Sequence, residues 1–440
     1  IGLTPVQLGS PDMPLELWFI TRLVCRQVDL YLDTLYSAFE MLASGVTTVQ
    51  HIHGWLPGKL PEVEGGAEDV LRAYDDVGMR VSYSFALRDQ NRLVYMDDDA
   101  FTKSLPPELQ GPMAEHFARF QMGSEDFIAL FETLYGRHHN KERIKIQLAP
   151  ANLHWCSDAA LARLAETSET YDVPLHMHLL ETAYQKAYAH RRGGCTAVDY
   201  IERFGLLGPR MTLGHGVWLS ESDIEKVAAS GTHICHNCSS NFRLRSGVGA
   251  LNVWERHGVN VAIGTDEAGI NDDRDMLQEM RMVLNAHRTP GMNDEVPTKA
   301  QVLRMATAGG AATTPYGATI GSLEVGKSAD LSLVDFDKIA YPHLDSATPV
   351  LDAVVHRAKT DGVDLVMCAG EVVYEQGRFT KVDRDAALEA LKADMDRAMT
   401  DDEVERRQLS KALLPHVVDF YDTYFDPAAH EPFYRQSSRV

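Results

Sequence analysis

Seven short, mostly apolar runs, each ending in polar residues and followed by a longer stretch of helical periodicity, dominate the chain between Gly45 and Asp266. The stretch 158–171, for example, places apolar residues three or four positions apart, as a helix packed on a sheet does. This alternation of strands and helices predicts a parallel sheet covered by helices. The seven runs are Gly45–His51, Met79–Leu87, Ile144–Pro150, Val173–Leu179, Met211–Val217, Thr232–Cys238 and Val259–Asp266.

The ends of these runs favour a closed (β/α)₈ barrel of the TIM type over an open, doubly wound sheet. Polar side chains cluster at the carboxyl ends of several runs, where such a barrel builds its active site. No glycine-rich phosphate fingerprint follows the early runs, although an open sheet that binds a dinucleotide would need one. A barrel needs eight strands, and residues 1–44 contain no convincing strand. We therefore expect the first barrel strand to lie upstream of Ile1.

The remainder of the chain predicts two further units after a catalytic barrel that spans residues 1–320. Residues 321–383 contain short β-type runs joined by turn residues, which indicates part of a small β-sandwich domain. Residues 384–440 are expected to form a helical C-terminal tail, because residues 384–425 are charged and helical in pattern.

Charge and hydropathy exclude several classes of protein. The 440 residues include 42 Lys and Arg against 63 Asp and Glu, which gives a formal charge of −21. The acids are spread along the chain, whereas a nucleic-acid binder needs a basic stripe. No apolar run reaches the ~18 residues of a membrane span, and the amino terminus lacks a signal-peptide pattern. We therefore expect no nucleic-acid or membrane partner.

The six cysteines are too sparse for a disulfide framework, which favours a reducing, cytoplasmic location. Cys235 and Cys238 have the CxxC spacing of a metal site. A structural zinc ion needs two more soft ligands, and no second CxxC pair exists, so the sequence argues against such a site.

The strongest chemical signal lies at the end of the run Val173–Leu179. His176 and His178 share one face of a strand, because side chains alternate, and Glu181 follows where the strand enters its loop. Neutral imidazole is a good ligand for zinc or iron, and a nearby carboxylate transfers protons. His215 and Asp266 end two further runs, so all these groups would meet at one mouth of a barrel. The sequence therefore predicts a metal-dependent hydrolase site.

Five segments resemble the amidohydrolase superfamily in order and spacing. The resemblance is strongest to its branch of cytosine, guanine and methylthioadenosine/adenosylhomocysteine deaminases and triazine hydrolases such as atrazine chlorohydrolase, and it covers roughly Ala38 to Asp335. The segments are HMHLLET, LGHGV, HNCSSNFRLRSG, IGTDEAGINDDRDMLQEMR and GSLEVGKSADLSLVD.

The resemblance implies a role for each of these strand ends. His178 and Asp266 match metal ligands, and Asp266 would also accept a proton from the attacking water. Glu181 matches the proton-shuttling carboxylate of the deaminases. His215 matches a histidine that in mononuclear members contacts the water or substrate more than the metal, so its role as a ligand stays open. No Lys ends the fourth strand, 147–150, which implies a single divalent ion, zinc or iron.

One departure from the family pattern leaves two interpretations. The family's first strand ends in a His-x-His ligand pair, whereas His51-Ile-His53 follows a run that matches the second strand. Either the ligand pair lies upstream of Ile1, or His51 and His53 have replaced it as ligands. We favour the first, in which His51 and His53 line the substrate pocket near Trp55; two solvated loop histidines are the remaining alternative.

Two more histidines are candidate substrate contacts. His154 follows the fourth strand at the predicted mouth, and His236 begins the loop that shapes the pocket in the family. The predicted activity is hydrolytic attack on an sp² carbon, deaminating a purine, pyrimidine, pterin or triazine. The same site would hydrolyse a carbamate, a urea or an aryl chloride, and a non-catalytic binding protein on a hydrolase scaffold is a further alternative. We expect a small-molecule substrate and a homo-oligomer.

Overall fold

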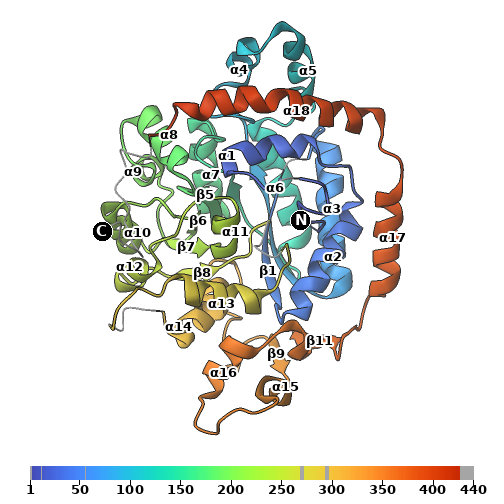
Figure 1. Ribbon diagram of the computed structural model, residues 1–440, viewed down its shortest axis with the longest axis vertical. Helices are drawn as coiled ribbons and strands as arrows, with labels where there is room; N and C mark the ends of the chain where they lie inside the picture. Colours follow the sequence, from blue (N-terminus) through green and yellow to red (C-terminus); the bar gives the residue numbers. More distant parts are fainter. Residues whose placement is uncertain (1, 11, 55, 268–271, 293–296, 427–440) are drawn as a thin grey trace.

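The computed structural model describes residues 2–10, 12–54, 56–267, 272–292 and 297–426, and Figure 1 shows its mixed α/β architecture. Eight strands form two four-stranded parallel sheets. These strands are β1 (Thr48–His53), β2 (Arg80–Leu87), β3 (Ile144–Ile146), β4 (Ala149–Pro150), β5 (Leu175–Leu179), β6 (Met211–His215), β7 (His233–His236) and β8 (Val261–Ile263).

The strands pair in chain order. In the first sheet β2 lies between β1 and β3 and also pairs with β4, and the second sheet has the order β5-β6-β7-β8. Isolated parallel bridges from Leu148 to Leu175 and from Asn152 to His178 connect the two sheets. The seven predicted runs therefore occur as parallel strands, with the run Ile144–Pro150 divided between β3 and β4.

The two edge strands, β1 and β8, do not pair with each other among the described residues, so closure into a barrel is not observed. A cavity of about 1300 Å³ is lined by residues of both edges, including Gln50 of β1 and Ile263 of β8. The expected strand between these edges stays a prediction.

Most of the helices that follow the strands share one large apolar core with them. The sequence determines where the helix after β6, α10 (Glu221–Ser230), begins and ends. Ser220 caps its start by accepting a hydrogen bond from Asp223 N, and Gly231 ends it with a φ of 75°. Helices up to β9 are α1 (Leu15–Trp18), η1 (Phe19–Leu23), α2 (Leu30–Ala43), α3 (Leu60–Val77), α4 (Asp98–Ser104), α5 (Pro107–Phe117), α6 (Ser124–His138), α7 (Asp158–Tyr171), α8 (Ala183–Gly193), α9 (Ala197–Glu202), α10 (Glu221–Ser230), α11 (Cys238–Arg243), α12 (Leu251–Arg256), α13 (Met276–Ala286), α14 (Lys299–Arg304) and η2 (Met305–Gly309). Of these, α1, η1, α4 and α5 contribute to a second apolar cluster.

The region after residue 320 forms one antiparallel sheet of order β12-β11-β10-β9. A second layer facing it is not seen in the described part of this region, so the predicted β-sandwich is not confirmed. Arg80 of β2 ties this sheet to the parallel strands through a buried ion pair, with Nη2 2.8 Å from Asp330 Oδ2. The elements are β9 (Leu331–Val334), α15 (Phe336–Ala340), α16 (Val350–Arg357), η3 (Thr360–Gly362), β10 (Val363–Cys368), β11 (Glu371–Glu375) and β12 (Arg378–Phe379).

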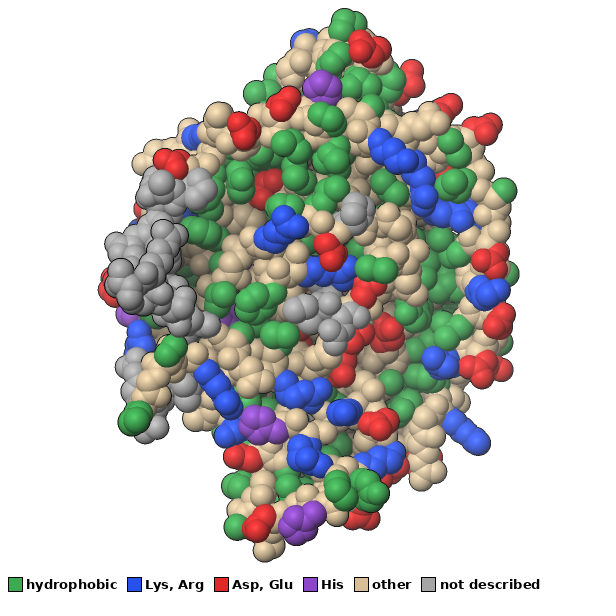
Figure 2. Space-filling model, viewed as in Figure 1, with side chains coloured by type: hydrophobic (Ala, Val, Ile, Leu, Met, Phe, Trp, Pro, Cys, Tyr) green, Lys and Arg blue, Asp and Glu red, His purple; other side chains and the backbone are tan. Residues whose placement is uncertain are grey.

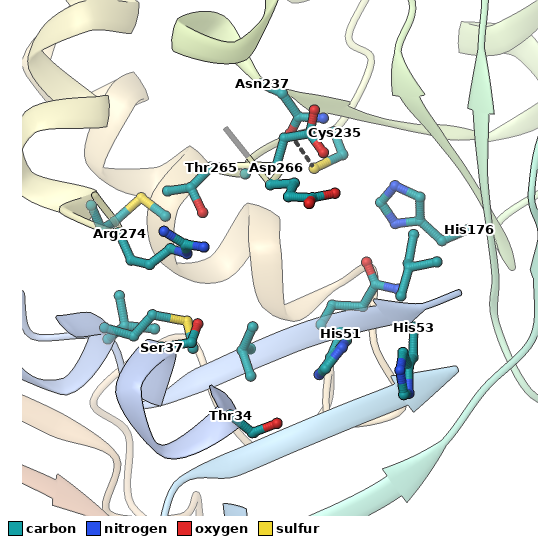
Figure 3. Close-up of a pocket in the computed structure, with 18 of the residues that line it drawn as sticks. Thr34, Ser37, His51, His53, His176, Cys235, Asn237, Thr265, Asp266 and Arg274 are labelled. Carbon is teal, nitrogen blue, oxygen red and sulfur yellow. Dashed lines mark hydrogen bonds between the residues drawn. The ribbon is translucent and has the colours of Figure 1, made fainter. Parts of the chain in front are cut away.

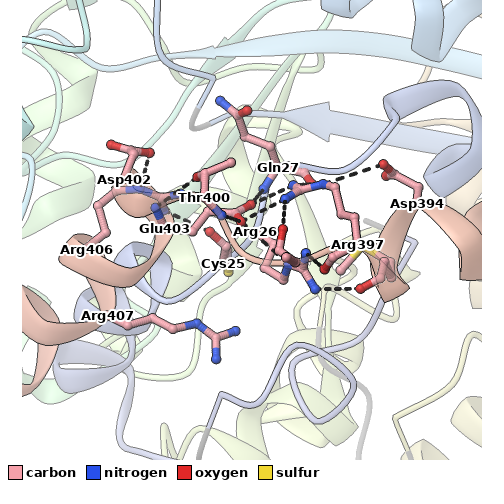
Figure 4. Close-up of polar contacts among 12 residues, drawn as sticks. Cys25, Arg26, Gln27, Asp394, Arg397, Thr400, Asp402, Glu403, Arg406 and Arg407 are labelled. Carbon is pink, nitrogen blue, oxygen red and sulfur yellow. Dashed lines mark hydrogen bonds and ion pairs between the residues drawn. The ribbon is translucent and has the colours of Figure 1, made fainter.

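Two helices, α17 (Arg384–Asp396) and α18 (Asp401–Asp422), follow the small sheet. Figure 1 shows α17 along the α2 side of the molecule and α18 crossing beside α1. The start of α18 is bound to the segment after η1, because Glu403 accepts from Gln27 N at 3.0 Å and Arg406 Nη1 donates to Cys25 O at 2.8 Å (Figure 4). Along α17, Figure 2 shows acidic and basic side chains side by side. No helix in the described ranges is long and apolar enough to cross a bilayer.

Candidate metal centre

Three metal-ligating groups from three strand ends meet at one side of the cavity. His178 lies in β5, His215 ends β6, and Asp266 follows β8 by three residues. Their potential ligand atoms all lie within 4.8 Å of one another. The convergence follows from the parallel topology, which brings the carboxyl ends of β5, β6 and β8 to one edge. Two imidazole nitrogens and a carboxylate oxygen suit zinc or iron.

Hydrogen bonds fix both imidazoles through the nitrogen that faces away from the donor set. His178 Nδ1 donates to Ala151 O at 2.8 Å, and His215 Nδ1 donates to Asn241 Oδ1 at 2.8 Å. This leaves Nε2 of each ring unprotonated, the tautomer found in metal-bound histidines. The Asn237 side-chain amide lies 3.4 Å from His215 Nε2. His215 Nε2 lies 4.0 Å from Asp266 Oδ2.

Two residues of the set have a backbone conformation that is uncommon for side chains other than glycine. The φ angle is 71° at His215 and 55° at Asp266. Such left-handed residues persist where the surrounding structure determines them, and they concentrate at functional sites. Ser240 Oγ also donates to Asp266 Oδ2 at 2.5 Å, which fixes that carboxylate.

Glu181 lies beside the donor set, with Oε2 3.6 Å from His215 Nε2. Its side chain is buried, its backbone N donates to Gln185 Oε1, and Ser246 Oγ donates to its carboxylate. Burial raises the pKa of Glu181 to about 7; His215 opposes this shift and Asp266 adds to it. A carboxyl group with this pKa gains and loses protons near neutral pH.

Burial also determines the charge of the histidines. Burial, followed by the neighbouring His215, lowers the pKa of His178 to about 4. Burial likewise lowers the pKa of His176, which precedes His178 by two residues, to about 3. Both imidazoles are therefore neutral at pH 7, the form that binds metal ions. His176 is not part of the three-residue donor set.

Figure 3 shows the cavity next to this set, with Asp266, Cys235 and Asn237 on one wall and His176 on the adjoining one. Thr34 and Ser37 of α2 lie on the opposite side. The space is large enough for a heterocycle with a substituent, since ligand sites commonly occupy about 300–1,000 Å³.

Comparison with known proteins identifies the family. The profile of the amidohydrolase family matches residues 5–373. The chain belongs to the amidohydrolase family. This confirms the resemblance seen in the sequence and makes the protein a hydrolase that acts on carbon–nitrogen bonds.

Individual relatives agree with this assignment. A 5-methylthioadenosine/S-adenosylhomocysteine deaminase of Syntrophobacter fumaroxidans is 29% identical over 388 residues, which cover 87% of this chain and 80% of the relative. An adenosine deaminase from Xanthomonas campestris, solved with bound zinc, is similar in fold with a TM-score of 0.75, 24% identity and coverage of 90% and 83%. Atrazine chlorohydrolase from Arthrobacter aurescens, also solved with zinc, has a TM-score of 0.72, 21% identity and coverage of 83% and 76%.

The His-x-His pair of this amidohydrolase lies apart from the donor set. His51 Nδ1 is 3.1 Å from the Tyr74 hydroxyl of α3, and His53 Nδ1 is 2.7 Å from the Tyr83 hydroxyl of β2. Figure 3 shows both rings pointing away from Asp266 and His176. Among the described residues neither ring shares a donor set with other ligands, so the geometry does not support their replacement of the family's ligand pair. Their predicted contact with substrate stays a prediction, and Trp55 lies outside the described residues.

The other two candidate histidines are also buried. The ring of His154 contacts Tyr95 at a centroid distance of 4.2 Å, and neither of its nitrogens has a hydrogen-bond partner among the described residues. His236 Nε2 lies 2.8 Å from His287 Nε2. His236 therefore belongs to a different group of side chains from His178 and His215. Neither His154 nor His236 lines the cavity, and their roles as substrate contacts stay predictions.

The sequence missed several residues that the structure places at the site. Asn241 and Ser240 hold His215 and Asp266, and their only sequence signal was their place in the predicted strand-seven loop. Arg22 of η1 and Arg88 after β2 line the same cavity, and no pattern marked either of them. The CxxC pair does not form one site: Cys235 donates to Asn237 Oδ1, whereas Cys238 lies near His236 and His287.

Proposed function

We propose that this amidohydrolase deaminates an aminated heterocycle with one divalent metal ion, zinc or iron. The observation that carries the proposal is the convergence of His178, His215 and Asp266 within 4.8 Å, with the Glu181 carboxylate beside them. The relative named as a 5-methylthioadenosine/S-adenosylhomocysteine deaminase supports an amino-purine ring as the first substrate class to test.

The residues present fit a metal ion. His178 and Asp266 would hold it, and His215 Nε2 would face either the ion or the attacking water. In both His178 and His215, Nδ1 donates to an acceptor, so Nε2 carries no proton, which is the tautomer that metal binding requires. When bound, such an ion supplies Lewis acidity that brings the pKa of a water towards ~7.

The chain's own residues would supply the proton transfers. Asp266 would accept the proton of the attacking water, because its carboxylate lies within the donor set. Glu181, with a pKa of about 7, would give a proton to a ring nitrogen or to the departing amine. Glu181 and His215 are both buried, which limits the access of bulk water to their side chains. Positioned acids and bases of this kind contribute roughly 10²- to 10⁴-fold to a rate.

We also propose the finer fold assignment on which this mechanism depends. The parallel strands β1 to β8, with β3 and β4 counted as one barrel strand, would belong to a (β/α)₈ barrel, with β1 and β8 on either side of the remaining strand. Residues 1–320 would form the catalytic unit, 321–383 part of a smaller β domain, and 384–440 the helical tail. A cytoplasmic location and a homo-oligomeric state also stay predictions.

The test is metal content combined with a substrate screen. Purified enzyme loaded with zinc or iron should hold one ion per chain and release ammonia from at least one aminated purine, pyrimidine, pterin or triazine. If the enzyme retains no metal after incubation with zinc and none after incubation with iron, the proposed centre is refuted. Release of chloride or of carbamate products without ammonia would assign the same site to one of the alternative leaving groups.

A further inference from the structure

Asn237 precedes α11 and lines the cavity, but its side chain does not cap the helix. An asparagine at this position commonly accepts from the backbone N of the second or third helical residue. Among the described residues the Asn237 side chain accepts no such bond, and Glu279 Oε1 instead accepts from Ser239 N at 3.0 Å. The Asn237 side chain is therefore directed to other contacts, in a residue that is only 5% exposed.

Two contacts orient the amide of Asn237. Cys235 Sγ donates to Oδ1 at 3.4 Å, a bond drawn in Figure 3, and Nδ2 lies 3.4 Å from His215 Nε2. Because His215 Nδ1 donates to Asn241, His215 Nε2 carries no proton and accepts from the Asn237 amide. A bond of 3.4 Å is long, so a nearer and more negative oxygen would replace it. The Asn237 N–H group thus points to the place where His215 would face the ion or the attacking water.

Gly264 leaves the space that this amide fills. It follows β8 directly and precedes Asp266 by two residues. A Cβ at this position would collide with Asn237 Oδ1 and would lie 2.9 Å from Cys235 Sγ. The φ angle of Gly264 is not in the left-handed region, so the close approach of the amide accounts for a glycine here.

We propose that the Asn237 amide donates a hydrogen bond to the oxygen that attacks the substrate carbon, with Cys235 and Gly264 as positioning residues. In deamination this oxygen forms a bond to the ring carbon, the carbon–nitrogen bond breaks, and ammonia leaves. The attacking water loses both protons: one ends on the ammonia and the other on a ring nitrogen, and the oxygen becomes a carbonyl. A fixed donor at this oxygen stabilises the negative charge that develops as the protons leave.

This role of Asn237 rests on the proposed function, because it needs a water that attacks beside His178, His215 and Asp266. It does not depend on the leaving group, since hydrolysis of a carbamate, a urea or an aryl chloride begins with the same attack.

Asn237→Asp tests the donor with little change of shape, because a carboxylate has no N–H group but still accepts from Cys235. Asn237→Ala removes the whole amide. Both variants should keep their metal, as metal analysis will show, while kcat falls by about 10²- to 10³-fold, the usual effect of removing one oxyanion donor. KM should change by less than about threefold, because the contact forms as the reaction proceeds and not on substrate binding.

Asn260 provides the matched control. It lies just before β8, at the opposite end of that strand from Gly264, and does not line the cavity. Its Nδ2 lies 3.0 Å from His233 Nδ1, so it makes the same kind of contact with a histidine. Asn260→Asp should therefore leave both kcat and KM unchanged.

Gly264→Ala distinguishes the position of the amide from its presence. In the wild type the added methyl group would displace the Asn237 amide and lower kcat. In the Asn237→Ala protein the methyl group has room, so the second change should lower kcat little further. General damage to the site would instead lower kcat equally in both proteins. Circular dichroism and metal content report whether each variant is folded.

Three results would overturn the role of Asn237. They are a kcat within about threefold of the wild type in Asn237→Asp or Asn237→Ala, loss of metal in both variants, and an equal effect of Gly264→Ala with and without the amide.

The deaminase proposal fails in a different way. A wild-type enzyme that holds metal and releases another leaving group without ammonia would refute deamination, and the same variants then test Asn237 on that reaction. A wild-type enzyme that hydrolyses no aminated ring, carbamate, urea or aryl chloride overturns both proposals.

Discussion

Glu403 of α18 provides a direct test of how the C-terminal helix is attached to the segment that carries Arg22. The Glu403 side chain is only 1% exposed and accepts from Arg397 Nη2 at 2.7 Å (Figure 4). It also accepts from the backbone N of Gln27 and of Thr400. These contacts, with Arg397 first, lower the pKa of Glu403 to about 2. The carboxylate therefore stabilises the folded protein as long as it is ionised.

The magnitude follows from this pKa. A carboxyl group whose pKa falls from about 4.3 to about 2 stabilises the fold by at most about 3 kcal/mol, because each pH unit is worth about 1.4 kcal/mol. Solvent screening of ion pairs near the surface reduces this to about 1–2 kcal/mol. Glu403→Gln should therefore lower the free energy of unfolding by about 1–2 kcal/mol at pH 7.

The pH dependence has a defined sign. Because the pKa of Glu403 is lower in the folded protein than in the unfolded chain, its contribution to the free energy of unfolding is complete above the unfolded pKa. This contribution is lost as the pH falls towards the folded pKa. The difference between wild type and Glu403→Gln should be constant above about pH 5 and roughly half as large at about pH 3.

Urea unfolding at several pH values measures this difference, and hydrogen exchange at the Gln27 amide reports the local attachment. Glu405→Gln is the matched control, because Glu405 lies two positions further along α18 on an exposed site. Equal stability of the two variants at pH 7, or a difference that does not shrink at low pH, would refute the reasoning.

Three further predictions concern the metal centre. Glu181→Gln should keep its metal while kcat falls by about 10²-fold or more, because a proton-transfer group is lost; metal loss on this change would instead make Glu181 a ligand. Asp266→Ala should bind metal weakly or not at all, as metal analysis after dialysis will show, because a ligand is removed. Asn241→Leu should lower metal affinity or kcat about 10- to 100-fold by releasing the His215 ring, and Asn241→Asp, which keeps an acceptor, should restore most of it.

The parallel order of the strands and the meeting of His178, His215 and Asp266 were predictable from sequence. Both depend on local patterns: apolar runs that alternate with helices, and polar residues at carboxyl ends that parallel pairing brings to one edge. The face of a strand is harder to predict when both faces carry polar residues. In β1, Gln50 and His51 necessarily point to opposite sides, and only the packing of His51 against Tyr74 shows which side faces α3.

Contacts between distant segments were not predictable. The runs after residue 320 indicated strands, but whether they form one sheet or a sandwich depends on what covers their faces, and the described part shows a single sheet. Likewise, nothing local in the sequence reveals that α18 binds the segment 23–27, since these contacts join residues more than 370 positions apart.

Local sequence patterns therefore reveal more about the reaction, whereas the substrate depends more on contacts between distant segments. The groups proposed to activate water lie on strand ends, so their residue types and spacing indicate the chemistry directly. The wall formed by Trp18 and Arg22 lies on helices near the start of the chain, and α18 holds the adjoining segment in place. Substrate choice in this amidohydrolase should therefore respond to changes in α18 that leave the metal donors untouched, and a rise in KM without loss of metal is the expected result of loosening that helix.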